Sequence, residues 1–338
     1  MPSWIETKQE ITRRNNDYDG VRRERIRAVE ALTGRPLIVY ATAFLSRDKV
    51  QTSSGEVVID GRDKQGFDEV TANIDGDSLD VLLHSPGGDP QAAESIVELL
   101  RSRFSSLRFI IPDQAKSAAT MMCCAGDEIL MDERSELGPI DPQMLLTRGD
   151  GVLIRAPAQA ILDQFDRAKD SLSKNPDHLP AWLPILQPLG PSLLTECEAA
   201  DQLARELVTS WLKRYMLSGR ADAADLAGQA AEYLADSKRH LSHGRRIGLR
   251  QMKELGLAVQ DMKDTPQLQA AIWELYQAIV WTLDDTNAFK IIENGRGEAF
   301  IRQVIIHQIS MPAEGKPLRR QQPGGPAGQA KAKRKRKR

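Results

Sequence analysis

The strongest constraint on the fold is the alternation of segments between residues 79 and 131. Three apolar segments there are short enough to be buried strands: LDVLLHS (79–85), LRFIIP (107–112) and DEILM (127–131). Between them, residues 90–104 and 117–126 have the apolar spacing of helices, and Gly126 would close the second helix. Strands that alternate with helices pair in parallel through right-handed crossovers. The sequence therefore predicts an α/β fold whose parallel sheet is built from βαβ units.

The flanking segments differ from this core in composition. Residues 1–34 are charged and helix-prone, and their helix should end at Gly34. The short β-branched run PLIVYATAFL follows and predicts one more strand. From about residue 157 the strand signal fades, and Ala- and Leu-rich segments acquire the amphipathic spacing of helices. We therefore expect a helical arm (1–34) and one α/β domain (35–311) with a helical extension.

A segment rich in proline interrupts that extension. Five prolines lie between Pro176 and Pro191, in NPDHLPAWLPILQPLGP. Proline removes a backbone donor and clashes with the preceding helical turn, so one continuous helix is excluded there. We expect an irregular excursion.

The chain ends in a basic tail. It carries 46 Lys and Arg against 47 Asp and Glu, but ten of the basic residues and none of the acidic ones lie in 316–338. Subtraction (36 minus 47) leaves −11 on residues 1–315. The composition of residues 312–338 cannot bury a core, so we expect this tail to be disordered. The run KAKRKRKR (331–338) could contact nucleic acid non-specifically through phosphates, or neighbouring acidic subunits.

The cysteines and the distribution of apolar residues indicate the cellular compartment. An odd number of cysteines, two of them adjacent (Cys123, Cys124 and Cys197), does not form a disulfide framework. The N-terminal segment lacks the apolar core of a signal peptide, and no apolar run approaches ~18 residues. We therefore expect a cytoplasmic protein that makes no membrane contact.

Two adjacent glycines, Gly87 and Gly88, lie in HSPGGDP (84–90), between a predicted strand and a predicted helix. They let the backbone turn sharply and expose its N–H groups beside the positive end of the helix. A phosphate or the oxyanion of an acyl-transfer intermediate could bind there, although an ordinary tight turn would use the same residues. No P-loop or GxGxxG motif accompanies the turn, so we expect no nucleotide cofactor.

Ser117 lies in a second bend, where a predicted strand leads into a helix of small residues. A serine in such a bend can present its hydroxyl above the sheet edge, and the next amide, of Ala118, can help to bind an oxyanion. Alternatively, the serine caps the helix. Both bends follow neighbouring parallel strands and should lie side by side, which favours a nucleophile.

These two segments resemble a known family. SPGGDPQAAESIVELLR, followed by IPDQAKSAATMMCCAGDEILMDERSELGPIDPQ, is similar to the serine dehydrogenase proteinase family. These Clp-fold serine proteinases are related to signal peptide peptidase A and Clp-type proteases within the crotonase-like fold. The resemblance covers roughly residues 75–145 and returns weakly in HLSHGRRIGLRQMKELGLAV. It implies that Ser117 is the nucleophile, that the amides of Gly88 and Ala118 form the oxyanion hole, and that Gly87 shapes the turn.

The family is described as using Ser, Asp and His in that chain order. Asp141, in the Pro-flanked turn GPIDPQ, suits an orienting carboxylate or a turn cap. A histidine precedes a helix such as IGLRQMKELGLAV in the family, so His243 is our choice for the base and His240 the second. These two histidines could in principle bind a metal, but no further ligands have the required spacing, and we expect none.

Other residues remain candidates for the general base. Three more histidines are His84, beside the Gly-Gly turn, His178 and His307. Membrane-bound relatives use a Ser–Lys dyad, in which a desolvated lysine takes the proton. Lys116 adjoins Ser117 and should point elsewhere, whereas no motif nominates the other lysines that we considered: Lys169, Lys174 and Lys213.

The sequence thus predicts a serine peptidase that hydrolyses peptide bonds through an acyl-enzyme on Ser117. Related proteases enclose their sites in oligomers, so we expect a homo-oligomer that acts on peptides or unfolded proteins. A crotonase-type acyl-CoA enzyme is a second hypothesis, but it would need glutamates near the oxyanion hole, and Glu94 and Glu128 are poorly placed. A third is a non-catalytic scaffold or nucleic-acid-associated protein that uses the basic tail.

Overall fold

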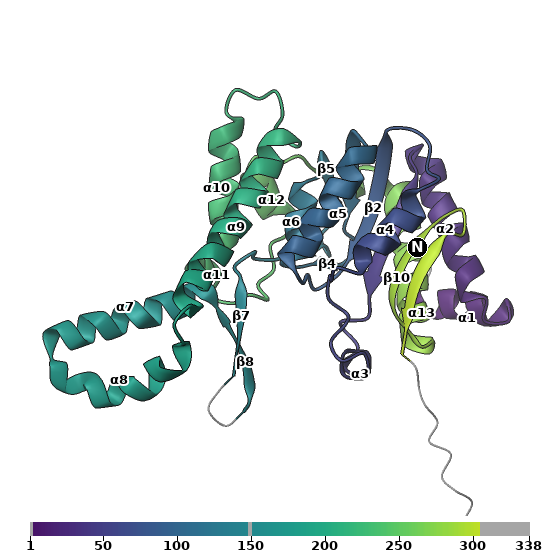
Figure 1. Cartoon of the computed structure of the whole chain (residues 1–338). Helices are drawn as coiled ribbons and strands as arrows, with labels where there is room; N and C mark the ends of the chain where they lie inside the picture. Colours follow the sequence, from purple (N-terminus) through teal and green to yellow (C-terminus); the bar gives the residue numbers. More distant parts are fainter. Residues whose placement is uncertain (1–2, 148–150, 305–338) are drawn as a thin grey trace, which may run out of the picture. The chain divides into compact units, whose positions relative to one another are not determined.

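A seven-stranded sheet with the order β11-β10-β1-β2-β3-β5-β9 forms the centre of the fold (Figure 1). This computed structural model describes residues 3–147 and 151–304. Five neighbouring strands pair in parallel: β1 (Leu37–Thr42), β2 (Ser78–His84), β3 (Ser106–Ile110), β5 (Glu128–Met131) and β9 (Val259–Asp261). At the other edge, β10 (Ala288–Asn294) and β11 (Ala299–Gln303) join antiparallel. The predicted α/β fold with a mainly parallel sheet is confirmed.

The helices occupy most of the remaining chain. The α-helices are α1 (Trp4–Arg13), α2 (Tyr18–Thr33), α3 (Arg47–Thr52), α4 (Asp63–Thr71), α5 (Pro90–Arg103), α6 (Ala118–Cys124), α7 (Ala158–Lys174), α8 (Leu179–Leu186), α9 (Leu193–Arg214), α10 (Ala223–Ala235), α11 (Ser237–His240), α12 (Leu249–Glu254) and α13 (Pro266–Asp285). Short 3-10 turns are η1 (Pro176–His178), η2 (Gln187–Leu189) and η3 (Met262–Asp264). In the described part of the chain, no helix is both long and apolar enough to cross a bilayer.

Successive side chains of the central strands enter two separate cores. Tyr40 and Val81 belong to the core that also contains residues of α5, α6, α9 and α10. Val39 and Leu82 belong to the core shared with α2 and α13. Because side chains alternate across a strand, each central strand serves both cores and is buried along nearly its whole length. This explains why these strands are continuous apolar runs in the sequence.

The half of the chain that we expected to be helical also contains strands. Here β9, β10 and β11 lie after residue 157, and a hairpin of β7 (Gln143–Thr147) and β8 (Leu153–Pro157) precedes it. Three polar side chains, Lys290, Glu293 and Asn294, interrupt the apolar pattern of β10, although all three are buried. Their burial depends on partners far away in the sequence, so the pattern of β10 alone did not indicate a strand.

Two local expectations outside the sheet are confirmed. Helix α2 ends before Gly34, which has a φ of +66° and donates its N–H to the carbonyl oxygen of Glu30 at 2.8 Å. The proline-rich segment is divided into η1, α8 and η2 and is not one helix. The predicted disordered tail, 312–338, lies outside the described residues.

Candidate active site

The glycine turn after β2 packs directly against the serine bend before α6. A Cβ atom added to Gly87 would lie 2.7 Å from Cβ of Ser117 and 2.8 Å from the amide nitrogen of Ala118. The close approach therefore requires glycine at position 87, whose φ is +89°. The two bends lie side by side, as expected for loops that follow neighbouring parallel strands.

Ser117 adopts a backbone conformation that residues with a side chain rarely adopt. Its φ is +53° and its ψ is −123°, and such a conformation costs about 1–3 kcal/mol. Although Ser117 occupies the N-cap position of α6, its side chain accepts no hydrogen bond from the helix. The alternative role of Ser117 as a helix cap is therefore not observed, and the bend holds an uncommitted hydroxyl at the sheet edge.

The backbone amides at the two bends have different partners. The N–H of Gly87 donates to Oγ of Ser85 at 3.2 Å, so this amide is already engaged within the turn. Ala118 is the first residue of α6, where an amide has no acceptor inside the helix. A Cβ on Gly88 would lie 2.3 Å from the carbonyl oxygen of Ile59, so a neighbouring chain segment also requires glycine at position 88.

His243 and Asp141 are joined by a hydrogen bond. Nδ1 of His243 lies 2.8 Å from Oδ1 of Asp141, and the other carboxylate oxygen accepts from Nε2 of Gln143 at 2.7 Å. Asp141 is 3% exposed, whereas the side chain of His243 is 28% exposed. A carboxylate only accepts hydrogen bonds, so Nδ1 carries the proton in this pair and Nε2 keeps a free lone pair.

Ser117 and His243 line one cavity of about 800 Å³, whereas Asp141 lies behind His243 and is not part of its wall. Ser117 and His243 contribute to its wall together with Gly87, Gly88 and Ala118. Much of the remaining wall is apolar and comes from Met121, Ile140, Met144, Leu145, Leu203 and Ala204. Charged side chains also line the cavity: Asp60, Asp89, Arg155 and Glu196.

Sequence patterns did not indicate the contribution of the β7–β8 hairpin and of α9 to this wall. The hairpin contributes Met144, Leu145 and Arg155, and α9 contributes Glu196 and Leu203. The Gly-Asp-Gly sequence between QMLLT and LIRAP is a turn signal that could have revealed the hairpin. For α9 no such signal exists, since its cavity face is defined only by packing.

The other histidines lie elsewhere. The ring of His240 is buried, and Nε2 lies 2.7 Å from the carbonyl oxygen of Tyr233. Burial lowers the pKa of His84 to about 3, because it penalises the charged imidazolium. His178 contacts Oγ of Ser171 at 2.9 Å in the α7–η1 segment. None of the three lines the cavity, and His307 is outside the described residues.

The lysines that could have served as bases are also accounted for. Nζ of Lys116 pairs with Oε2 of Glu136 at 2.7 Å and donates to the carbonyl oxygen of Leu137 at 3.2 Å, as we expected for a side chain that points away from Ser117. Lys169, Lys174 and Lys213 are exposed. Of the described residues that line the cavity, none is a lysine.

The residues considered for two other chemistries can also be placed. Glu94 and Glu128, the glutamates considered for crotonase-type chemistry, do not line the cavity, whereas Glu196 does. Over residues 3–147 and 151–304, no group of three or more His, Cys, Asp or Glu side chains is arranged to hold a metal ion.

Comparison with known proteins gives one family match and several partial similarities. Residues 67–181 match the family of ClpP-like SDH-type serine proteinases. An uncharacterized protein of Methanocaldococcus jannaschii is 41% identical over 66 residues, which are 20% of this chain and 23% of the relative. A second from the same organism is 33% identical over 95 residues, 28% of this chain and 30% of the relative. The chain thus spans less than a third of the length of these relatives.

A solved structure of a mutant of a membrane-bound stomatin-specific protease is 14% identical. It aligns with 63% of this chain and 79% of its own, with a TM-score of 0.38. The resemblance noted from the motifs at Gly88, Ser117 and Asp141 falls inside the family match at residues 67–181. Over residues 67–181, about a third of its length, the chain is similar to the ClpP-like SDH-type serine proteinases.

Proposed function

We propose that this protein is a serine peptidase with Ser117 as nucleophile, His243 as general base and Asp141 as the residue that orients the base. The observation that carries the proposal is the 2.8 Å bond between His243 and Asp141, in a cavity that Ser117 also lines. The match of residues 67–181 to a family of serine proteinases supports it independently. The strained backbone of Ser117 is a third support, since such strain concentrates at functional sites.

The proposed reaction follows from the hydrogen-bonding capacity of each group. Nε2 of His243 takes the hydroxyl proton while Oγ of Ser117 forms a bond to the peptide carbonyl carbon. The protonated imidazole then gives this proton to the leaving amine as the C–N bond breaks, which leaves an acyl-enzyme. A water molecule, deprotonated by the same imidazole, then attacks the ester carbon. The C–Oγ bond breaks as the imidazolium returns the proton to Oγ of Ser117, and the carboxylic acid is released. Asp141 keeps Nδ1 protonated throughout and stabilises the imidazolium.

The negative charge that develops on the carbonyl oxygen needs two donors. We assign these to the amides of Gly88 and Ala118, because the two bends are packed together beside Ser117. The amide of Gly87 donates to Ser85, so Gly87 shapes the turn and does not contribute a donor. Removing one such donor typically costs about 100- to 1000-fold in kcat.

The cavity wall indicates the substrate class. Its apolar side chains, including Met121, Met144 and Leu203, would bury an apolar side chain of the peptide next to the scissile bond. Burying a leucine-sized side chain is worth about 1.5–3 kcal/mol, or roughly 10- to 100-fold in kcat/KM. We therefore propose peptides or unfolded segments with apolar residues at that position. The homo-oligomer expected from the sequence stays a prediction.

Peptide hydrolysis by single-residue variants tests the proposal. Ser117→Ala and His243→Gln should each lower kcat by several orders of magnitude, because members of a triad act as a unit. His178→Gln is the matched control, since this exposed histidine does not line the cavity. Full activity in Ser117→Ala would contradict the proposal at its central residue.

A further inference from the structure

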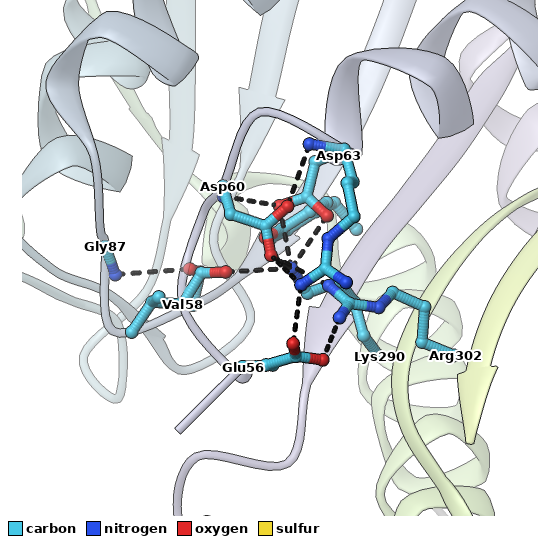
Figure 2. A network of polar contacts seen from close by, with 10 residues as sticks. Glu56, Val58, Asp60, Asp63, Gly87, Lys290 and Arg302 are labelled. Atoms are coloured by element: carbon cyan, nitrogen blue, oxygen red, sulfur yellow. Dashed lines mark hydrogen bonds and ion pairs between the residues drawn. The ribbon is translucent and has the colours of Figure 1, made fainter. Parts of the chain in front are cut away.

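A buried lysine lies at the centre of a polar network on β10 (Figure 2). Nζ of Lys290 lies 2.7 and 2.8 Å from the two carboxylate oxygens of Asp63, and both side chains are fully buried. It also donates to the carbonyl oxygen of Val58 at 2.8 Å. Removing two charges from water is costly unless they are paired and hydrogen-bonded, so this pair requires a well-defined geometry.

One connection leads from this pair to the glycine turn through the backbone of residues 58–60. Asp63 accepts a hydrogen bond from the amide of Asp60 at 3.0 Å, and Lys290 holds the carbonyl of Val58, so both ends of the segment are fixed. Between them, the amide of Ile59 donates to the carbonyl of Gly87 at 2.8 Å. The carbonyl of Ile59 in turn accepts from the amide of Asp89 at 3.0 Å. Residues 58–60 are thus hydrogen-bonded to the turn on both sides of Gly88.

A second connection runs through side chains to the same turn. The hydroxyl of Tyr40 donates to Oδ2 of Asp63 at 2.7 Å and is itself hydrogen-bonded by the hydroxyl of Ser85. Oγ of Ser85 accepts from the amide of Gly87 at 3.2 Å. The donors therefore point in one direction, from Gly87 through Ser85 and Tyr40 to the carboxylate of Asp63. Lys290 compensates the charge at the end of this chain of hydrogen bonds.

An outer layer of charges surrounds the pair. Oδ2 of Asp60 lies 2.8 Å from Nη1 of Arg302, which Figure 2 shows beside it. The same oxygen lies 3.4 Å from Nη2 of Arg62. Burial alone would raise the pKa of Asp60, but the charge of Lys290 and the hydrogen bonds from the two arginines lower it to about 2. Asp60 therefore stays ionised and paired with the two arginines. Its backbone amide is fixed separately, by the hydrogen bond to Asp63.

We propose that the Lys290–Asp63 pair is a positioning pair for the oxyanion hole, acting through residues 58–60 and through Tyr40 and Ser85. The inference rests on the proposed function. Neither Lys290 nor Asp63 lines the cavity, so their effect on the reaction is indirect, through the glycine turn and through residues 58–60, which line the cavity themselves. A displacement of about 1 Å of an aligned group can cost roughly 100-fold in rate, and both connections end at the turn that carries the donor of Gly88.

The fold offers a matched control on the same strand. Arg22 and Glu293 form another fully buried ion pair, and Arg22 also donates to Oγ1 of Thr282 at 2.9 Å. Glu293 is three residues from Lys290 on β10, so the two side chains lie on opposite faces of the sheet. This pair connects β10 to α2 and α13, not to the glycine turn. Glu293→Gln and Asp63→Asn remove the same charge with a similar change of shape.

The first readout is steady-state hydrolysis of a peptide with an apolar residue before the scissile bond. Asp63→Asn should lower kcat about 10- to 100-fold, with KM within about twofold of the wild type, because a misplaced donor weakens transition-state binding alone. Glu293→Gln should leave kcat unchanged at a temperature where both variants are folded. Equal kcat values in the two variants would overturn the inference.

The second readout needs no turnover. Hydrogen exchange of peptides covering residues 56–61 and 84–91 should be faster in Asp63→Asn than in the wild type and unchanged in Glu293→Gln. If the wild type hydrolyses no peptide, the proposed function fails, while this measurement still decides whether the pair holds the turn. Unchanged exchange in both segments would contradict the positioning role.

Asp63→Asn leaves a buried lysine short of a partner and could prevent folding, so Tyr40→Phe and Ser85→Ala provide a second test. Both keep the ion pair, and a phenylalanine would still stack on Phe67, whose ring centre is 5.5 Å from that of Tyr40. Each variant breaks the connection to the amide of Gly87. We expect kcat to fall about 3- to 10-fold in each, and no additional loss in the double variant, because both act on one connection. A wild-type kcat in both variants would show that the connection through Tyr40 and Ser85 does not position the turn.

Discussion

Nδ1 of His243 lies 2.8 Å from Oδ1 of Asp141, although 102 residues separate the two in the chain. The turn that carries Asp141 follows β5, and His243 lies in the connection between α11 and α12. The fold thus brings a carboxylate and an imidazole together, and the imidazole lines the same cavity as Ser117.

The first prediction concerns Asp141→Asn. An amide can donate to Nδ1 of His243, which favours the tautomer that carries its proton on Nε2 and cannot accept the proton of Ser117. We expect kcat to fall about 1000- to 10000-fold, by analogy with the same change in serine protease triads. Thermal unfolding should change little, because the amide remains isosteric with the carboxylate. An active Asp141→Asn variant would show that His243 does not need this orientation.

The second prediction compares two glycines with similar backbone conformations. Gly87 and Gly76 have φ values of +89° and +94°, so alanine at either position should cost about 1–2 kcal/mol of stability through backbone strain. Only at position 87 would the new Cβ meet neighbours, among them the carbonyl oxygen of Lys116 at 2.5 Å. Gly87→Ala should therefore lose at least about tenfold in kcat, whereas Gly76→Ala keeps its kcat. Equal kcat values would show that the close approach is not needed for the reaction.

The third prediction concerns the residue before the scissile bond. In a series of otherwise identical peptides, leucine or methionine at this position should give kcat/KM values roughly 10- to 100-fold above those for aspartate or lysine. The reason is the apolar wall that includes Met121, Ile140 and Leu203. A preference for a charged residue would assign the specificity to Arg155 or Glu196 instead.

The fourth prediction concerns stability as a function of pH. The folded-state pKa of His84 is about 3, because burial penalises its charged form, while an unfolded histidine titrates near ~6.5. The unfolded chain therefore binds one more proton than the folded chain between these values, and the stability that His84 contributes above pH ~6.5 is lost as the pH falls. The slope is about 1.4 kcal/mol per pH unit.

The predicted loss of stability can be measured as the free energy of unfolding, by urea denaturation at pH 7 and pH 5. Between these two values the wild type should lose about 2 kcal/mol more than His84→Gln, since all other titrating groups are common to both. Nδ1 of His84 makes no hydrogen bond to any residue that the structure describes, and Oδ2 of Asp113 is 3.8 Å away. A contact with the backbone of Gln114 opposes the effect of burial on the pKa of His84 only in part. Identical losses in the two proteins would mean that His84 is protonated in the folded state.

The parts of the site that could be predicted from the sequence were those defined by local backbone geometry. Gly88 and Ser117 each follow a buried strand, and parallel pairing alone predicts that their bends are neighbours. Asp141 and His243 could be nominated only by resemblance, because nothing local in either segment specifies a contact over 102 residues.

Lys290 and Asp63 could not be predicted at all. Lysine and aspartate in isolation are typical of solvated surfaces, and the burial of this pair follows from β10 pairing antiparallel with β1. For the same reason, continuous apolar runs in the sequence revealed β1, β2, β3 and β5 but not β10, whose polar side chains are buried with partners.

The most direct test of the central claim is labelling by a fluorophosphonate probe, followed by mass spectrometry of the labelled peptide. A serine reacts with this probe only when its hydroxyl is activated and an oxyanion site accepts the phosphoryl oxygen. We predict one modification, at Ser117, whose rate falls sharply in His243→Gln. Labelling of another serine, or an unchanged rate in His243→Gln, would contradict the account.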